Sequence, residues 1–112
     1  MNKNINLPLT ETIYYILLAL ATPNHGYAIM QQVEELSEGN VRLAAGTLYG
    51  ALENLLEKKF IASVQGSDAR RKVYVISQRG KQVLLEDYQR IKALVDVTST
   101  VFDFEREVNK NV

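Results

Sequence analysis

The sequence places hydroxyl side chains where a helix would present them to phosphate. A helix is predicted from about Ala45 to Lys58, and it carries Thr47 and Tyr49 near its start. Their hydroxyls suit phosphate oxygens or base edges of DNA. Gly46 in the first turn would let a nucleic-acid backbone approach the helix's unpaired amides. This end of the helix is therefore a candidate DNA contact.

A second candidate contact is the cationic run Arg70, Arg71 and Lys72. It follows Gln65–Ala69, a stretch rich in turn formers, and precedes a predicted strand. Guanidinium groups at a hairpin tip can grip phosphate or enter a narrow minor groove. Alone, such a run is equally typical of a solvated turn. The interpretation of this run as a DNA contact is favoured because the hydroxyl-bearing helix indicates the same function.

Other chemistry is poorly supported. The chain of 112 residues has no cysteine and one histidine, His25, so no disulfide framework and no cysteine- or histidine-based metal site is expected. A site built from Asp and Glu at a dimer interface stays open. No nucleophile–base pair or glycine-rich phosphate loop stands out, so we expect neither enzymatic activity nor a cofactor. We expect His25 to cap or pack at a helix start. No stretch is long and apolar enough to span a bilayer, and we expect a cytoplasmic protein.

The formal net charge is zero, but its distribution is uneven. Residues 1–39 carry a net charge of −3, residues 40–79 carry +4 and residues 80–112 carry −1. The candidate DNA contacts thus lie in the basic third, and an electrostatic footprint depends on distribution rather than total.

The elements around these residues follow the plan of a winged helix-turn-helix. Two helices are predicted first, one capped by Thr10 and running to about Thr22, the other from about Tyr27 to Ser37. A very short strand is expected at 41–43 and a hairpin at 60–64 and 73–76. The predicted fold class is mainly α (α+β), with a DNA-binding domain at residues 1–77.

Residues 78–112 are predicted to form one long dimerisation helix, capped by Ser77 and reaching about Glu107. Its apolar residues form two adjacent seams with heptad-like spacing. Because two seams exceed what the rest of a small domain covers, a second copy is the simplest partner, although the helix could also fold back over its own core. The residues expected at the dimer interface are Leu84, Tyr88, Ile91, Leu94, Val95, Thr98, Val101 and Phe102.

Three segments together resemble the PadR family of bacterial regulators. They are 25–27 (His-Gly-Tyr), 46–52 (Gly-Thr-Leu-Tyr-Gly-Ala-Leu) and 70–74 (Arg-Arg-Lys-Val-Tyr), with Gly80 further on. The resemblance, the polar helix face and the cationic run together give the expected DNA-binding residues, which are Tyr27, Gly46, Thr47, Tyr49, Gly50, Asn54, Arg70, Arg71 and Lys72. Gly50 replaces the proline that the family usually has after its Leu-Tyr pair.

The resemblance implies a homodimer that represses transcription from an inverted-repeat operator and is released by a small hydrophobic or phenolic effector. In drug-binding relatives the effector lies between the two last helices. By position, Asp87, Ile91, Leu94 and Val95 would be near it, with Asp96 as another counter-charge. Ile91 stands where those relatives often place an aromatic ring, which weakens the case for flat aromatic drugs.

Two alternatives stay open at this point. A winged helix can serve as a protein-interaction module without DNA binding, and the zero net charge would suit that role. A DNA-binding dimer can also lack a ligand if its own side chains fill the interface.

Overall fold

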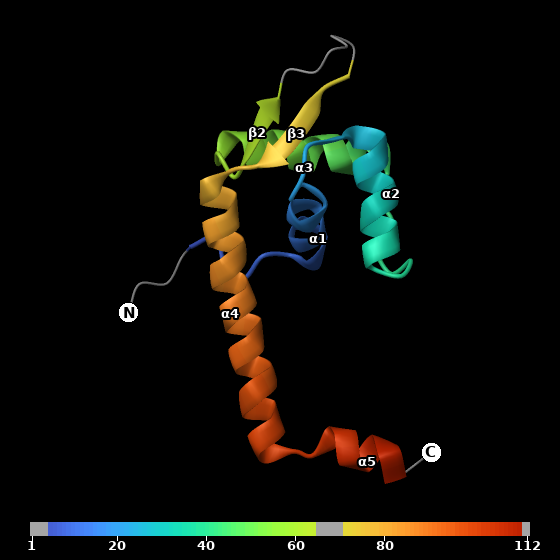
Figure 1. The fold of residues 1–112 in the computed structure, drawn as a ribbon, viewed down its shortest axis with the longest axis vertical. Helices are drawn as coiled ribbons and strands as arrows, with labels where there is room; N and C mark the ends of the chain where they lie inside the picture. The colour runs from blue at the N-terminus through green and yellow to red at the C-terminus, as the bar shows by residue number, and fades with distance from the viewer. Residues whose placement is uncertain (1–4, 65–70, 111–112) are drawn as a thin grey trace.

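The computed structural model describes residues 5–64 and 71–110, with only the backbone described for 108–110 (Figure 1). Three helices come first: α1 (Glu11–Ala19), α2 (Gly26–Leu36) and α3 (Ala45–Glu57). The hairpin strands β2 (Ile61–Val64) and β3 (Val73–Ile76) follow, and then α4 (Gln78–Val101) and α5 (Phe104–Lys110). The predicted order of helices and hairpin is therefore confirmed, and with it the mixed α and β winged-helix fold.

The core lies where α1, α2 and α3 meet the hairpin and the start of α4. Each helix contributes its apolar stripe, and burial of these side chains is the main force that holds the short elements together. The largest fully buried apolar side chains are Ile16, Leu17, Leu20, Ile29, Val33, Leu48, Leu52, Leu55 and Val83.

The sheet contains a third strand, which the residue pattern does not predict. β1 (Asn24–His25) pairs antiparallel with β3, so that β3 lies between β1 and β2. The expected strand at residues 41–43 is wrong, because these residues form no strand and connect α2 to α3 instead. β1 thereby joins the start of α2 to the first half of β3, Val73 and Tyr74.

The junction of the wing and α4 is closely packed. Ser77 Oγ accepts a hydrogen bond from the Gly80 amide at 3.0 Å and donates one to the Lys59 carbonyl oxygen at 2.7 Å. A Cβ at Gly80 would lie 2.0 Å from the carbonyl oxygen of Phe60. The predicted cap at Ser77 is thus confirmed, and only glycine allows this approach.

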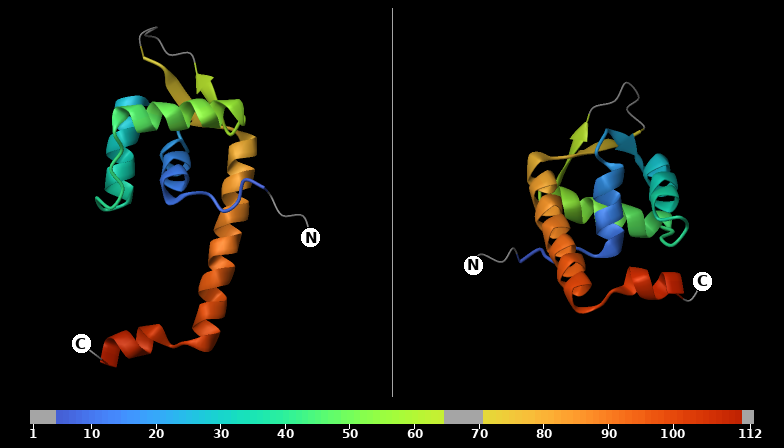
Figure 2. Two further views of the ribbon diagram at one scale, coloured as in Figure 1. Left: turned by 180° about the vertical axis from the view of Figure 1, so that it is seen from behind. Right: turned by 60° about the horizontal axis from the view of Figure 1, so that its bottom comes forward.

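The expected single last helix is wrong beyond Val101, where the chain turns and continues as α5 (Figures 1 and 2). The turn follows three hydroxyl residues, 98–100, whose side chains bond carbonyl oxygens of the preceding turn and so compete with the helix. Phe102 is extended, and Asp103 Oδ1 then accepts from the Arg106 amide at 3.1 Å, which caps α5. The two apolar seams therefore do not run on along one helix to Glu107.

The far half of α4 extends away from the other helices (Figure 1). The chain has a radius of gyration of 16.8 Å, whereas a compact domain of this length would have about 13 Å. The excess reflects this extension of α4, whose side chains from 91 to 101 are all exposed.

Candidate nucleic-acid interface

The exposed face of α3 is polar. Leu48, Leu52 and Leu55 are buried, which turns the rest of the helix outward. Thr47 and Asn54 are exposed, and Tyr49 is 54% exposed, so Tyr49 is not a core residue. Gly46 and Gly50 are also exposed, and no atom lies within 4 Å of the position that a Cβ would occupy at either residue. The structure thus brings all five α3 candidates to open surface.

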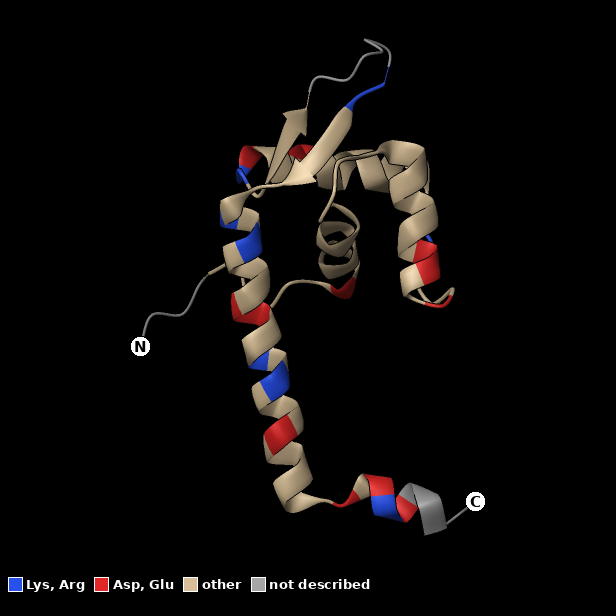
Figure 3. Ribbon diagram, viewed as in Figure 1, with Lys and Arg blue, Asp and Glu red and all other residues tan. Residues whose placement is uncertain are grey.

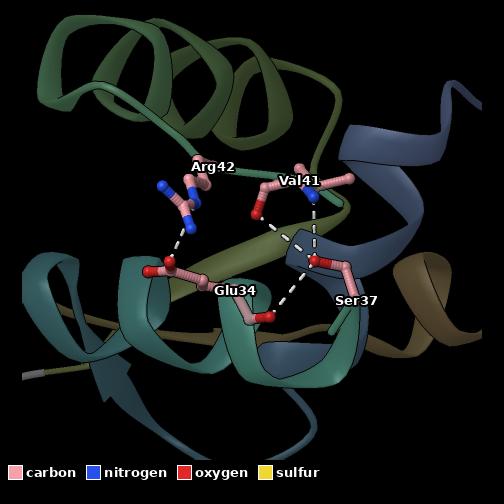
Figure 4. Close-up of polar contacts among 4 residues, drawn as sticks. All are labelled: Glu34, Ser37, Val41 and Arg42. Atoms are coloured by element: carbon pink, nitrogen blue, oxygen red, sulfur yellow. Dashed lines mark hydrogen bonds and ion pairs between the residues drawn. The ribbon is translucent and has the colours of Figure 1, made fainter. Parts of the chain in front are cut away.

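The connection between α2 and α3 is held by Glu34 of α2 and by Ser37, the residue that caps the end of this helix (Figure 4). Buried Ser37 accepts a hydrogen bond from the Val41 amide at 2.9 Å, and its hydroxyl lies 3.3 Å from the carbonyl oxygens of Glu34 and Val41. Arg42 forms an ion pair with Glu34 at 3.0 Å. These contacts fix where α3 begins relative to α2, and hence where its first turn is presented.

A hollow of about 530 Å³ lies between α2, α3 and the wing. This volume falls within the range of about 300–1,000 Å³ that is typical of small-molecule pockets. Its lining comes from three separate segments: His25, Gly26, Tyr27, Tyr49, Arg71 and Lys72. The predicted DNA contacts include Tyr27, Tyr49, Arg71 and Lys72. They do not include His25 or Gly26, which also line the hollow. β1, which pairs His25 with Val73 of β3 and is followed at once by Gly26, is too short for a strand pattern to predict.

The cations of the hollow come from the wing. Arg71 and Lys72 are exposed and directly precede β3, and the coil that leads into this strand is blue in Figure 3. Arg70, the third candidate, lies outside the described residues. Tyr74 follows in β3 but does not line the hollow, and burial and then the neighbouring Tyr49 raise the pKa of its hydroxyl above the ordinary value. The hollow thus combines phenol hydroxyls, two cations and the start of α2.

The apolar residues of α4 form a second surface. Leu84 is half-buried against the core, but Tyr88, Ile91, Leu94, Val95, Val101 and Phe102 are between 38% and 68% exposed. Thr98 is exposed as well. Phe102 stacks on Phe104, with ring centroids 4.9 Å apart. We call the residues Tyr88, Ile91, Leu94, Val95, Thr98, Val101 and Phe102 the α4 apolar face.

The residues expected near an effector are divided by the structure. Asp87 and Ile91 line a pocket of about 350 Å³ between α1 and α4, together with Leu9, Glu11, Tyr14, Tyr15 and Leu18. Leu94 and Val95 do not line it. Burial, then Asp87 and then Tyr88, raises the pKa of Tyr14 above 10.0. Three aliphatic and two tyrosine side chains thus line most of the pocket, beside the buried carboxylate of Asp87 and the exposed one of Glu11.

Helices packed beneath a three-stranded sheet, with a wing beside α3, define the chain as a winged helix-turn-helix protein. The comparison with known families makes this specific. Residues 15–86 match the transcriptional regulator PadR-like family, and the chain belongs to it. The predicted family is confirmed, and its members are transcription regulators rather than enzymes.

Individual relatives are more distant. Transcriptional regulator YqjI of Escherichia coli K12 is 25% identical over 71 residues, which are 63% of this chain but only 34% of that protein. The chain therefore spans about a third of the length of this curated relative. A PadR family transcriptional regulator from Eggerthella lenta is 25% identical, with a TM-score of 0.64 over 80% of this chain and 79% of that one.

A PadR family transcription regulator from Clostridium difficile R20291 is likewise 25% identical, with a TM-score of 0.63 over 80% of this chain and 96% of the other.

Within the described residues, no cluster of three or more potential metal ligands occurs and no helix is long and apolar enough to cross a membrane.

Proposed function

We propose that this chain binds double-stranded DNA as a homodimer and represses transcription from an inverted-repeat operator. The observation that carries the proposal is the juxtaposition of the polar face of α3 with Arg71 and Lys72 around one hollow. In this arrangement α3 enters the major groove and the wing lies along the backbone or the adjacent minor groove. The position of the positive charge supports it, because the basic middle third supplies this side of the fold.

The binding experiment measures fluorescence anisotropy over a salt series. The DNA directly upstream of the gene is compared with a random duplex of equal length. Preferential binding to the upstream DNA that weakens steeply with salt is expected, because cation–phosphate contacts release counterions. Failure to bind either duplex at low salt would contradict the proposal and favour the protein-interaction module.

The α4 apolar face supports the homodimer. Large side chains that are half exposed along one helix lose their contact with water when a second copy packs on them. A two-fold dimer would place two α3 helices about one helical turn of DNA apart, or a multiple of it, and this spacing predicts an inverted repeat. Light scattering at micromolar concentration tests this step, and a monomer would contradict it.

The pocket between α1 and α4 supports an effector. Its apolar lining suits a small hydrophobic ligand, and the unpartnered Asp87 oxygen suits a hydroxyl donor on that ligand, as in a phenol. Because α4 carries both this pocket and the α4 apolar face, a ligand there can bias the distance between the two DNA-binding units. Release of bound DNA by p-cresol, but not by 4-methylanisole, which lacks the hydroxyl donor, is the expected result.

A further inference from the structure

Gly26 and Tyr49 lie in direct contact across the hollow. Gly26 is the first residue of α2 and is buried, while Tyr49 projects from α3. A Cβ built on Gly26 would lie 2.8 Å from Tyr49 Oη, 3.2 Å from Cζ and 3.4 Å from Cε1. Since Cβ contacts below 3.0 Å are essentially never observed, any other residue at position 26 would displace the tyrosine ring.

The atoms that a Cβ would displace belong to a side chain that can move. Tyr49 is 54% exposed, so its ring can swing outward with little loss of core packing. At Gly80, by contrast, the obstructing atom is the backbone carbonyl oxygen of Phe60. A Cβ at position 26 therefore alters the position of one hydroxyl rather than the fold.

The present position of that hydroxyl is informative. It lies against the first residue of α2, where the N-cap residue, His25, makes no side-chain capping hydrogen bond. Arg71 and Lys72 line the same hollow. A phosphate group in the hollow would meet a phenol donor and two cations, a combination that suits a DNA backbone phosphate.

We infer that Gly26 is a positioning residue for DNA binding: the absence of a Cβ seats the Tyr49 hydroxyl in the hollow, where it donates to a backbone phosphate. This inference rests on the proposed function, because it needs DNA as the ligand. It assigns to Gly26 a role that neither its own chemistry nor its place in a turn reveals.

The test uses a random 30-bp duplex, so that no operator is needed, and four variants: Gly26→Ala, Tyr49→Phe, Tyr49→Ala and Gly26→Ala with Tyr49→Ala. Gly26→Ala is expected to weaken binding about 3- to 10-fold, as Tyr49→Phe does, because each removes one hydrogen bond to phosphate. The slope of log affinity against log salt stays unchanged, since the cations remain. In the Tyr49→Ala background, Gly26→Ala is expected to have no further effect.

Two results would overturn the inference. One is Gly26→Ala that binds as tightly as the wild type. The other is a further loss when Gly26→Ala is added to Tyr49→Ala, because the Cβ would then act on something other than the ring. Ala93→Ser is the control, because Ala93 is exposed on α4 and does not line the hollow, and it should leave binding unchanged.

Thermal unfolding distinguishes a loss of DNA binding from a loss of the fold. Gly26→Ala is expected to unfold at or above the wild-type temperature, because alanine favours the helix over glycine. If Gly26→Ala unfolds the chain while the double variant folds, the contact with Tyr49 is still established, and the comparison of Tyr49→Ala with the double variant decides the binding role. A wild type that binds no duplex would instead contradict the proposed function itself.

Discussion

Asp87 Oδ1 accepts a hydrogen bond from Arg90 Nε at 2.6 Å, whereas Asp87 Oδ2 is buried and has no hydrogen-bond partner among the described residues. Asp87 is only 1% exposed, while the Arg90 side chain is 38% exposed. A buried carboxylate that satisfies one oxygen of two costs stability, because desolvation of the second oxygen is uncompensated. Such a group is therefore a candidate for function rather than for stability.

The first prediction separates these roles by substitution. Arg90→Ala is expected to lower the free energy of unfolding by about 1–3 kcal/mol, because it removes the charged hydrogen bond that Asp87 Oδ1 accepts. Asp87→Leu, which has nearly the same shape in an apolar pocket, is expected to be neutral or stabilising. Urea unfolding of both variants checks this, and a strongly destabilised Asp87→Leu would show that the carboxylate is structural.

The second prediction concerns Gly80. Gly80→Ala is expected to lower the free energy of unfolding by about 2–3 kcal/mol, because its Cβ would collide with the Phe60 carbonyl oxygen and push α4 away from the wing. Gly50→Ala is the control. It lies on open surface of α3, so it should raise stability by up to about 1 kcal/mol. Equal stability of the two variants in urea would contradict the packing argument.

The main helices and the wing could be predicted because their signals are local and repeated. Thr10 caps α1 through a bond to the Ile13 amide, and Ser77 caps α4, as their residue types indicate. The burial of Leu48, Leu52 and Leu55 follows from their helical spacing. These features depend on neighbours within about four residues, so the sequence displays them.

Other features depend on contacts that the sequence does not display. β1 has two residues, too few for a strand pattern, and it exists because β3 offers it a partner. The seating of Tyr49 on Gly26 joins positions 23 residues apart on two helices. The end of α4 is not predicted for another reason. The apolar spacing continues to Phe104, past the helix-weakening run at 98–100 and the cap at Asp103.

The third prediction tests the wing. Arg71→Ala and Lys72→Ala are each expected to weaken binding to specific and random duplexes alike, and each should reduce the salt slope by about one. Lys92→Ala, on α4 and away from the hollow, should leave the slope unchanged. Anisotropy titrations at several salt concentrations measure this. An unaltered slope in both wing variants would mean that neither cation meets phosphate.

The fourth prediction tests the α4 apolar face. Replacement of Ile91 and Val95 by aspartate is expected to give monomers of 12.7 kDa by light scattering, because two charges would be buried without partners in the dimer. Ala93→Asp is the matched control: it adds a charge to the same helix, and at 100° per residue it lies on the opposite face.

Because α3 of each copy would then act alone, the monomeric variant should also lose most of its preference for the inverted repeat over a random duplex, while Ala93→Asp keeps it. Residual low-salt binding to the random duplex should survive in both variants, since Arg71 and Lys72 are intact. If the dimer persists with both aspartates in place, the interface does not lie on the α4 apolar face, and α1 would become the next surface to test.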